Sequence, residues 1–113
     1  MELDKYQAQQ KKCAFYPKLG TMQGLAYTAL AMCGEAGEAA NIIKKALRED
    51  RELTSAEKEA LMLELGDVLY YLTASASELS ISLTAVAWAN TVKINKRRVE
   101  LILRRKESQE EDH

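Results

Sequence analysis

The sequence predicts an all-α fold of four helices, arranged like a four-helix bundle and completed by self-association. Its 113 residues correspond to one domain, expected over residues 1–106, with residues 107–113 as a frayed acidic tail. One proline and five glycines are too few for the many turns of an all-β fold. Apolar residues recur every three or four positions, which is the period of an amphipathic helix. A helical domain this small often completes its core against a second copy of itself.

The first two helices are separated by a short break. A helix over residues 3–13 is expected to end before Pro17 and Gly20. Thr21 is the expected N-cap of a long second helix that ends near Arg48. The stripe predicted to face the core of this second helix consists of Leu25, Ala29, Met32, Ala36, Ala40, Ile43 and Leu47.

The last two helices follow a charged turn. Thr54 and Glu57 have the spacing of a capping box, so a third helix is expected to start there and run to about Glu78. Ser82 is the expected cap of a fourth helix over about residues 83–105. Short connections favour antiparallel neighbours and hence a bundle. The core stripe predicted for the third helix is Leu61, Leu65, Val68, Leu72, Ala76 and Leu79.

Overall charge and hydropathy exclude several classes of protein. The net charge of -1 argues against a general nucleic-acid binder, which needs a basic surface. No stretch approaches the roughly 18 apolar residues of a membrane span. The polar N-terminus carries no signal-peptide core, so the cytoplasm is the expected location and neither a membrane nor a nucleic acid is an expected partner.

Four acidic residues give the main indication of function. Glu35 and Glu38 on the second helix, and Glu64 and Asp67 on the third, each form an i,i+3 pair at the edge of an apolar stripe. None has a Lys or Arg three or four residues away, and each faces its own like charge. If the two helices are antiparallel neighbours, the carboxylates converge. A cation from outside the two helices is then needed to offset their repulsion.

The ligand type selects the cation. The only histidine is His113, which argues against zinc or a histidine-containing di-iron site. All-carboxylate coordination suits Mg²⁺, with Mn²⁺ as a substitute, and bound Mg²⁺ is commonly completed by water and substrate phosphates. Each acidic pair is also flanked by glycine inside a predicted helix, where glycine costs about 1 kcal/mol relative to alanine. The glycines are Gly34, Gly37 and Gly66, and we expect a ligand or another backbone to approach them closely.

The two acidic motifs resemble the signature of the MazG-like family of all-α nucleoside triphosphate pyrophosphohydrolases. The family pattern, Glu-x-x-Glu followed by Glu-x-x-Asp, reads here as residues 34–38 and 64–71, and further similarity extends from about Tyr6 to Arg97. The resemblance implies a bundle that works as a homodimer or homotetramer, four acids that act as metal ligands, and Mg²⁺-dependent release of pyrophosphate from a nucleoside triphosphate. The chain departs from many relatives after Arg97, where their Gly- and Arg-containing segment is replaced by a basic stretch and an acidic tail.

Candidate substrate contacts lie on three helices. Asn90, Lys93 and Arg97 form one stripe of the fourth helix at positions i, i+3 and i+7, and Lys45 follows Glu38 by seven residues. A solvated basic face is the alternative interpretation of these residues. Tyr71 shares a stripe with Glu64 and Asp67, where it either contacts substrate or lies at the edge of the core. Weaker candidates for contacting a base are Phe15, Tyr16 and Trp88.

The predicted reaction is hydrolysis, with Glu35 or Glu38 as the carboxylate that accepts a proton from water. Two other classes of function stay open at this point. The chain could be a non-enzymatic, regulatory metal-binding bundle, although all four acids are present. It could also be a helical interaction module whose basic fourth helix docks on nucleic acid.

Overall fold

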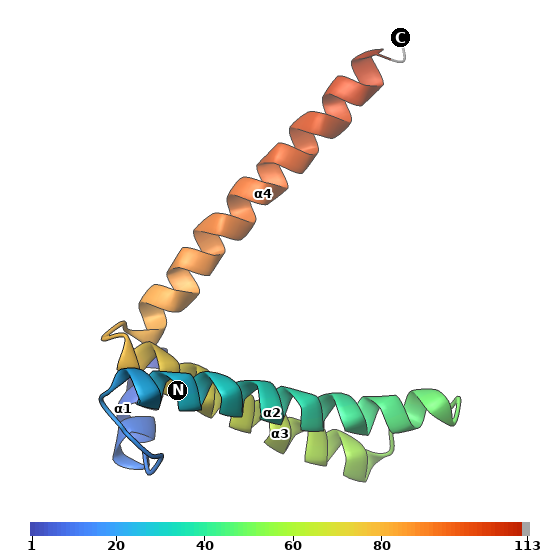
Figure 1. Cartoon of the computed structure of the whole chain (residues 1–113). Helices are drawn as coiled ribbons and strands as arrows, with labels where there is room; N and C mark the ends of the chain where they lie inside the picture. Colours follow the sequence, from blue (N-terminus) through green and yellow to red (C-terminus); the bar gives the residue numbers. More distant parts are fainter. Residues whose placement is uncertain (112–113) are drawn as a thin grey trace.

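The computed structural model describes residues 1–111, which form four helices and no strand. They are α1 (Leu3–Lys12), α2 (Met22–Arg48), α3 (Ser55–Glu78) and α4 (Leu83–Glu111). Figure 1 shows that α2 and α3 run side by side as an antiparallel hairpin, with α1 beside the base of this hairpin. Helix α4 leaves the base on the side opposite to α1, so the chain has the shape of a V. The all-α prediction is confirmed, but α4 does not join a bundle within one chain.

The helix starts follow the capping residues. The hydroxyl of Thr21 accepts a hydrogen bond from the backbone N–H of Gly24 at 3.2 Å. At the start of α3, Thr54 and Glu57 form the predicted capping box, with reciprocal hydrogen bonds of 3.0 and 3.1 Å. These caps fix where each arm of the hairpin begins, and therefore which residues of α2 and α3 lie opposite one another.

The fourth helix is longer than predicted. It continues through Glu111 rather than ending near Arg105, so the acidic segment 107–111 is helical, and residues 112–113 lie outside the described part of the chain. The residues after Arg105 are mostly Lys, Glu and Gln, which are good helix formers. Their charge does not prevent a solvated helix. No helix in the described residues is long and apolar enough to cross a membrane.

The seam between α2 and α3 is made of small side chains. Thr28 and Thr73 are fully buried, and the Thr28 hydroxyl is 2.9 Å from the hydroxyl of Ser75. Small residues allow close approach of two helices because little volume separates the backbones. The other buried aliphatic residues of these two helices are Ala39, Ala46, Ala74 and Ala76.

The core stripe predicted for α2 is only partly buried in the described chain, because Leu25 and Met32 are half-buried but the rest of the stripe is exposed. Ala36 and Ala40 are exposed, Ile43 is 47% exposed and Leu47 is 77% exposed. The α3 stripe is only partly buried, with Leu65 57% exposed. The physical reason is that α2 has one neighbour, α3, which covers the Thr28 side of the helix. No other helix of the described chain lies over the apolar side.

A buried glutamine sets the direction in which α4 leaves. The Gln7 side chain on α1 donates hydrogen bonds to Ser77 Oγ at 3.1 Å and to the Ile81 carbonyl at 3.0 Å. Its Oε1 accepts a hydrogen bond from the backbone N–H of Leu83 at 2.8 Å. Thr84 donates to Asp4 at 2.8 Å on the same side. One side chain thus joins α1, the end of α3 and the first turn of α4.

Replacing Gly24 by alanine is expected to destabilise the fold by about 1–3 kcal/mol. A Cβ at this position would lie 2.4 Å from the carbonyl oxygen of Lys18, so the turn before α2 would have to move. Chemical denaturation measures the change. Gly66→Ala is the matched control, because an added Cβ there meets no atom of the chain within 4 Å. An equal loss in both variants would contradict the assigned clash.

Candidate metal centre

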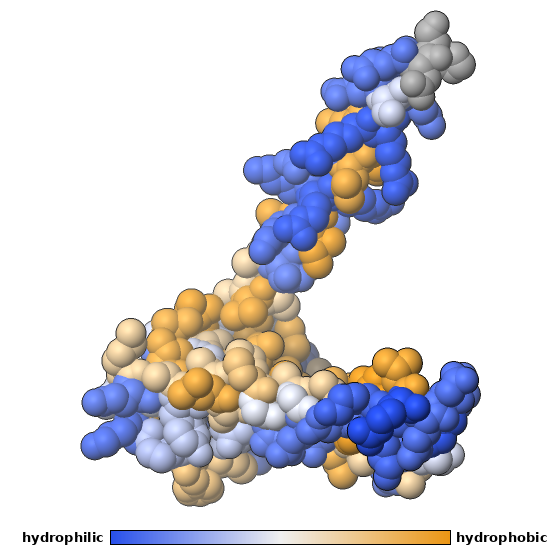
Figure 2. Space-filling view, turned by 45° about the vertical axis from the view of Figure 1, so that its right-hand side comes forward, coloured by the Kyte–Doolittle hydropathy of each residue, from blue (hydrophilic) through white to orange (hydrophobic). Residues whose placement is uncertain are grey.

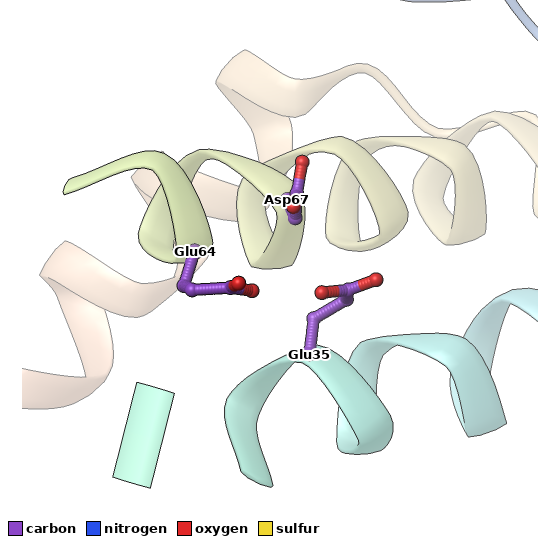
Figure 3. Close-up of side chains that lie close together, drawn as sticks. All are labelled: Glu35, Glu64 and Asp67. Atoms are coloured by element: carbon purple, nitrogen blue, oxygen red, sulfur yellow. The ribbon is translucent and has the colours of Figure 1, made fainter. Parts of the chain in front are cut away.

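Three carboxylates from the two arms of the hairpin converge midway along it. Glu35 of α2, and Glu64 and Asp67 of α3, each place one carboxylate oxygen so that all three lie within 4.8 Å of one another (Figure 3). Glu35 and Glu64 are half-buried, whereas Asp67 is exposed. The antiparallel pairing predicted from the sequence therefore brings three of the four predicted ligands together. Glu38 lies outside this group, one turn along α2.

The environment of Glu64 is the strongest indication that this cluster binds a cation. Its Oε2 atom is buried and has no hydrogen-bond partner in the described chain. A hydrogen bond with Glu35, burial, and the charges of Glu35 and Asp67 raise the pKa of Glu64, while a hydrogen bond with Glu38 acts in the opposite direction. Within residues 1–111, none of these carboxylates forms an ion pair with Lys or Arg. The donor set and its uncompensated charge fit a hard divalent cation such as Mg²⁺.

A pocket of about 400 Å³ opens beside the acids. Glu35 and Asp67 form its acidic end, and the other lining residues are Cys13, Phe15, Tyr16, Tyr27, Tyr70 and Tyr71. Tyr16 and Tyr27 are stacked, with ring centroids 6.3 Å apart and an angle of 11° between the ring planes. The pocket thus joins two carboxylates, which would hold a cation, to an aromatic wall on which a planar ring can stack.

Hydrogen bonds hold the aromatic wall in place. Tyr16 donates to the carboxylate of Glu78, which also accepts from the backbone N–H of Gly20 at 3.0 Å. Tyr70 donates to the carbonyl oxygen of Cys13 at 2.6 Å. Burial and the bond to Glu78 raise the pKa of Tyr16, so its hydroxyl stays protonated at neutral pH. The segment between α1 and α2 is therefore fixed against α3.

Sequence reasoning named part of this pocket. It selected Tyr71, Phe15 and Tyr16, all of which line the pocket, but it missed Tyr27 and Tyr70. Tyr27 precedes Glu35 by eight residues, about two helical turns, so a search for aromatics at that spacing would have found it. Trp88, the third aromatic candidate, lies on α4 and is not part of this wall.

The basic candidates do not reach the acids within one chain. Asn90, Lys93 and Arg97 lie on α4, which points away from the hairpin (Figure 1). Lys45 lies farther along α2, in a separate recess that it shares with Glu57. The glycine expectation also fails within one chain, because a Cβ added at Gly34, Gly37 or Gly66 meets no atom within 4 Å.

The raised pKa of Glu64 predicts how stability depends on pH. Because the folded state holds the Glu64 proton more tightly than the unfolded chain does, stability without metal is expected to decrease as the pH rises from 4.5, the ordinary pKa of a glutamate, through the raised pKa. Mg²⁺ binds the ionised form, so adding it is expected to reverse this decrease near neutral pH. Thermal melts from pH 4 to 8, with EDTA or Mg²⁺, measure both effects. Identical melting curves in the two buffers at pH 8 would contradict the prediction.

Comparison with known proteins shows which family the sequence matches. Residues 23–101 match the model of the MazG nucleotide pyrophosphohydrolase domain. The chain is also similar to the Gene 37 protein of Mycobacterium phage L5, with 37% identity over 102 residues that cover 87% of this chain and 90% of that protein. No solved structure matches the chain. The matched range contains both acidic motifs and the first two thirds of α4.

Proposed function

Because the chain belongs to the MazG nucleotide pyrophosphohydrolase family, we propose that it hydrolyses a nucleoside triphosphate to the monophosphate and pyrophosphate in a Mg²⁺-dependent reaction. The observation that carries the proposal is the convergence of Glu35, Glu64 and Asp67 around the unpartnered Oε2 of Glu64. Mn²⁺ has the same preference for oxygen ligands and is expected to substitute.

The metal would be held by the three converging carboxylates, with Glu38 beside them. When bound, Mg²⁺ supplies positive charge to the phosphate oxygens and lowers the pKa of a coordinated water. Glu35 and Asp67 also line the aromatic pocket, so a triphosphate held there directs its base toward Tyr16 and Tyr27. Tyr71 lines the same pocket and is proposed to contact the sugar or the base.

The proposed general base is Glu38, with Glu35 as the other candidate. Glu38 is exposed and stands outside the three-carboxylate group, so water can reach it and transfer a proton to its carboxylate. The oxygen of that water forms a bond to the α-phosphorus. The bond from the α-phosphorus to the bridging oxygen of the β-phosphate breaks, and pyrophosphate leaves with the bonding electrons.

A nucleotide panel tests this function directly. The protein is incubated with ribo- and deoxyribonucleoside triphosphates, with Mg²⁺ or with EDTA, and both pyrophosphate and orthophosphate are quantified. Pyrophosphate release that requires Mg²⁺ is the expected result. Orthophosphate release would overturn the assignment of the α-phosphorus. No turnover of any nucleotide, combined with Mg²⁺-dependent folding, would instead indicate a non-enzymatic metal-binding bundle.

A further inference from the structure

Gln10 on α1 is a buried amide without a hydrogen-bond partner. Its side chain is 4% exposed. Within residues 1–111 neither Nε2 nor Oε1 of Gln10 has a partner, and both atoms are closed off from solvent. Gln7, three residues earlier, uses both of its amide atoms in three hydrogen bonds. Because burying an unpaired polar group costs free energy, the fold alone gives no reason for an amide at position 10.

Gln10 lines a pocket of about 370 Å³ between α1 and the end of α3, which we call the α1 pocket. Figure 2 shows hydrophobic surface along α4 and on the hairpin. The α1 pocket takes no residue from α4, and from the hairpin it takes only the last turn of α3. The lining residues with polar side chains are Gln10, Lys11, Tyr16, Ser77, Glu78 and Ser80.

The α1 pocket is separate from the metal centre but shares a wall with the aromatic pocket beside it. None of Glu35, Glu64 and Asp67 lines the α1 pocket. Tyr16 lines both pockets, and Glu78 holds it in place. A ligand in the α1 pocket would therefore contact the same tyrosine as a ligand in the aromatic pocket, without contacting the acids.

The polar groups of the α1 pocket favour a neutral, planar ligand. A primary amide has a donor beside an acceptor, so its best partner presents an acceptor beside a donor in the same plane. The edges of nucleobases have this arrangement, and a glutamine side chain pairs with adenine in this way. Lys11 and Glu78 are the only charged residues of the lining, and their formal charges cancel. The ring of Tyr16 offers an aromatic surface against which a base can pack.

We infer that the α1 pocket binds a nucleoside, and that the base of this nucleoside pairs with the amide of Gln10. The volume of the pocket lies in the usual range for sites that bind small molecules. The amide turns toward the ligand about its last torsion, which is only weakly restricted in glutamine. Ser77 accepts a hydrogen bond from Gln7, which leaves its own O–H to donate to the ligand. This inference does not depend on the proposed hydrolysis.

Replacing Gln10 by methionine tests whether the amide is paired inside the chain. Methionine has a similar length and carries no amide, so the substitution removes two unpaired polar atoms from a buried position. We expect the ligand-free Gln10→Met protein to melt at a higher temperature than the parent. Gln7→Met is the matched control and should melt at a lower temperature, because it removes three hydrogen bonds. A lower melting temperature for Gln10→Met would show that the amide has partners in the chain, and would overturn the inference.

Calorimetric titration tests the ligand. Adenosine, guanosine, cytidine and uridine are added to the protein in EDTA, where no metal is bound and no turnover contributes. We expect at least one of them to bind the parent, with an affinity that falls at least about tenfold in Gln10→Met because two hydrogen bonds to the base are lost. Phe15→Ala, an exposed residue that lines only the aromatic pocket, is expected to bind the nucleoside as the parent does.

Two outcomes of the titration would reject the nucleoside site. One is that no nucleoside binds the parent. The other is that Gln10→Met binds as tightly as the parent, which would assign the nucleoside to another surface. Neither outcome bears on pyrophosphate release, which the nucleotide panel with Mg²⁺ measures separately.

Discussion

Replacing Glu64 by glutamine is expected to reduce pyrophosphate release at least about a hundredfold and to raise the melting temperature of the metal-free protein. A bound divalent ion contributes several kcal/mol of transition-state stabilisation, and each 1.4 kcal/mol corresponds to a factor of ten in rate. The same change removes one of three clustered carboxylates, where the hydrogen bond with Glu35, burial and the charges of Glu35 and Asp67 raise the pKa of Glu64. Activity and metal-free stability should therefore change in opposite directions.

Two measurements separate this expectation from general damage to the fold. The rise in melting temperature that Mg²⁺ gives the parent should be absent in Glu64→Gln, because the metal has lost a ligand. Glu59→Gln is the matched control, since Glu59 is an exposed acid on the same helix outside the cluster. A Glu64→Gln protein with parent activity would remove Glu64 from the metal site. A protein with less activity and a lower melting temperature would indicate a structural role instead.

The acidic site was predictable because it depends on two local facts. The i,i+3 spacing sets each pair on one side of its helix, and the short turn between Arg48 and Thr54 forces α2 and α3 to be antiparallel neighbours. Glu35, Glu64 and Asp67 then meet whatever the rest of the chain does. Glu38 lies one turn farther along α2 and outside this group. The i,i+3 spacing alone does not distinguish Glu38 from Glu35 as a ligand.

The packing of α2 and the position of α4 were not predictable in the same way. Periodicity identified Ile43 and Leu47 as residues that need cover, but it does not say which surface supplies that cover. In the single chain α3 packs on the side of Thr28 and Ala39, where small residues allow close approach. The bulkier stripe is left for another surface.

The direction of α4 depends on one polar side chain that no periodic pattern could single out. Gln7 is 6% exposed and bonds three groups on three different segments. Replacing it by methionine, which has a similar length, would leave the buried N–H of Leu83 and the carbonyl of Ile81 without these partners. Each buried polar group left unpaired costs about 1–3 kcal/mol, so we expect a loss of about 3 kcal/mol in chemical denaturation. Gln9→Met, at an exposed position of the same helix, should lose far less.

The Gln7→Met substitution should also reduce pyrophosphate release, although Gln7 contacts none of the carboxylates of the metal site. If α4 must leave the base in one direction to pack against a second copy of the chain, loosening its first turn lowers the population of chains that are ready to pair, and the apparent affinity between copies falls with it. We therefore expect Gln7→Met to dissociate at protein concentrations where the parent stays associated, and to lose pyrophosphate release in proportion. Raising the protein concentration should restore the activity of Gln7→Met but not that of Glu64→Gln. A Gln7→Met protein that is less stable yet associates as tightly as the parent would mean that packing between copies, and not Gln7, sets the direction of α4.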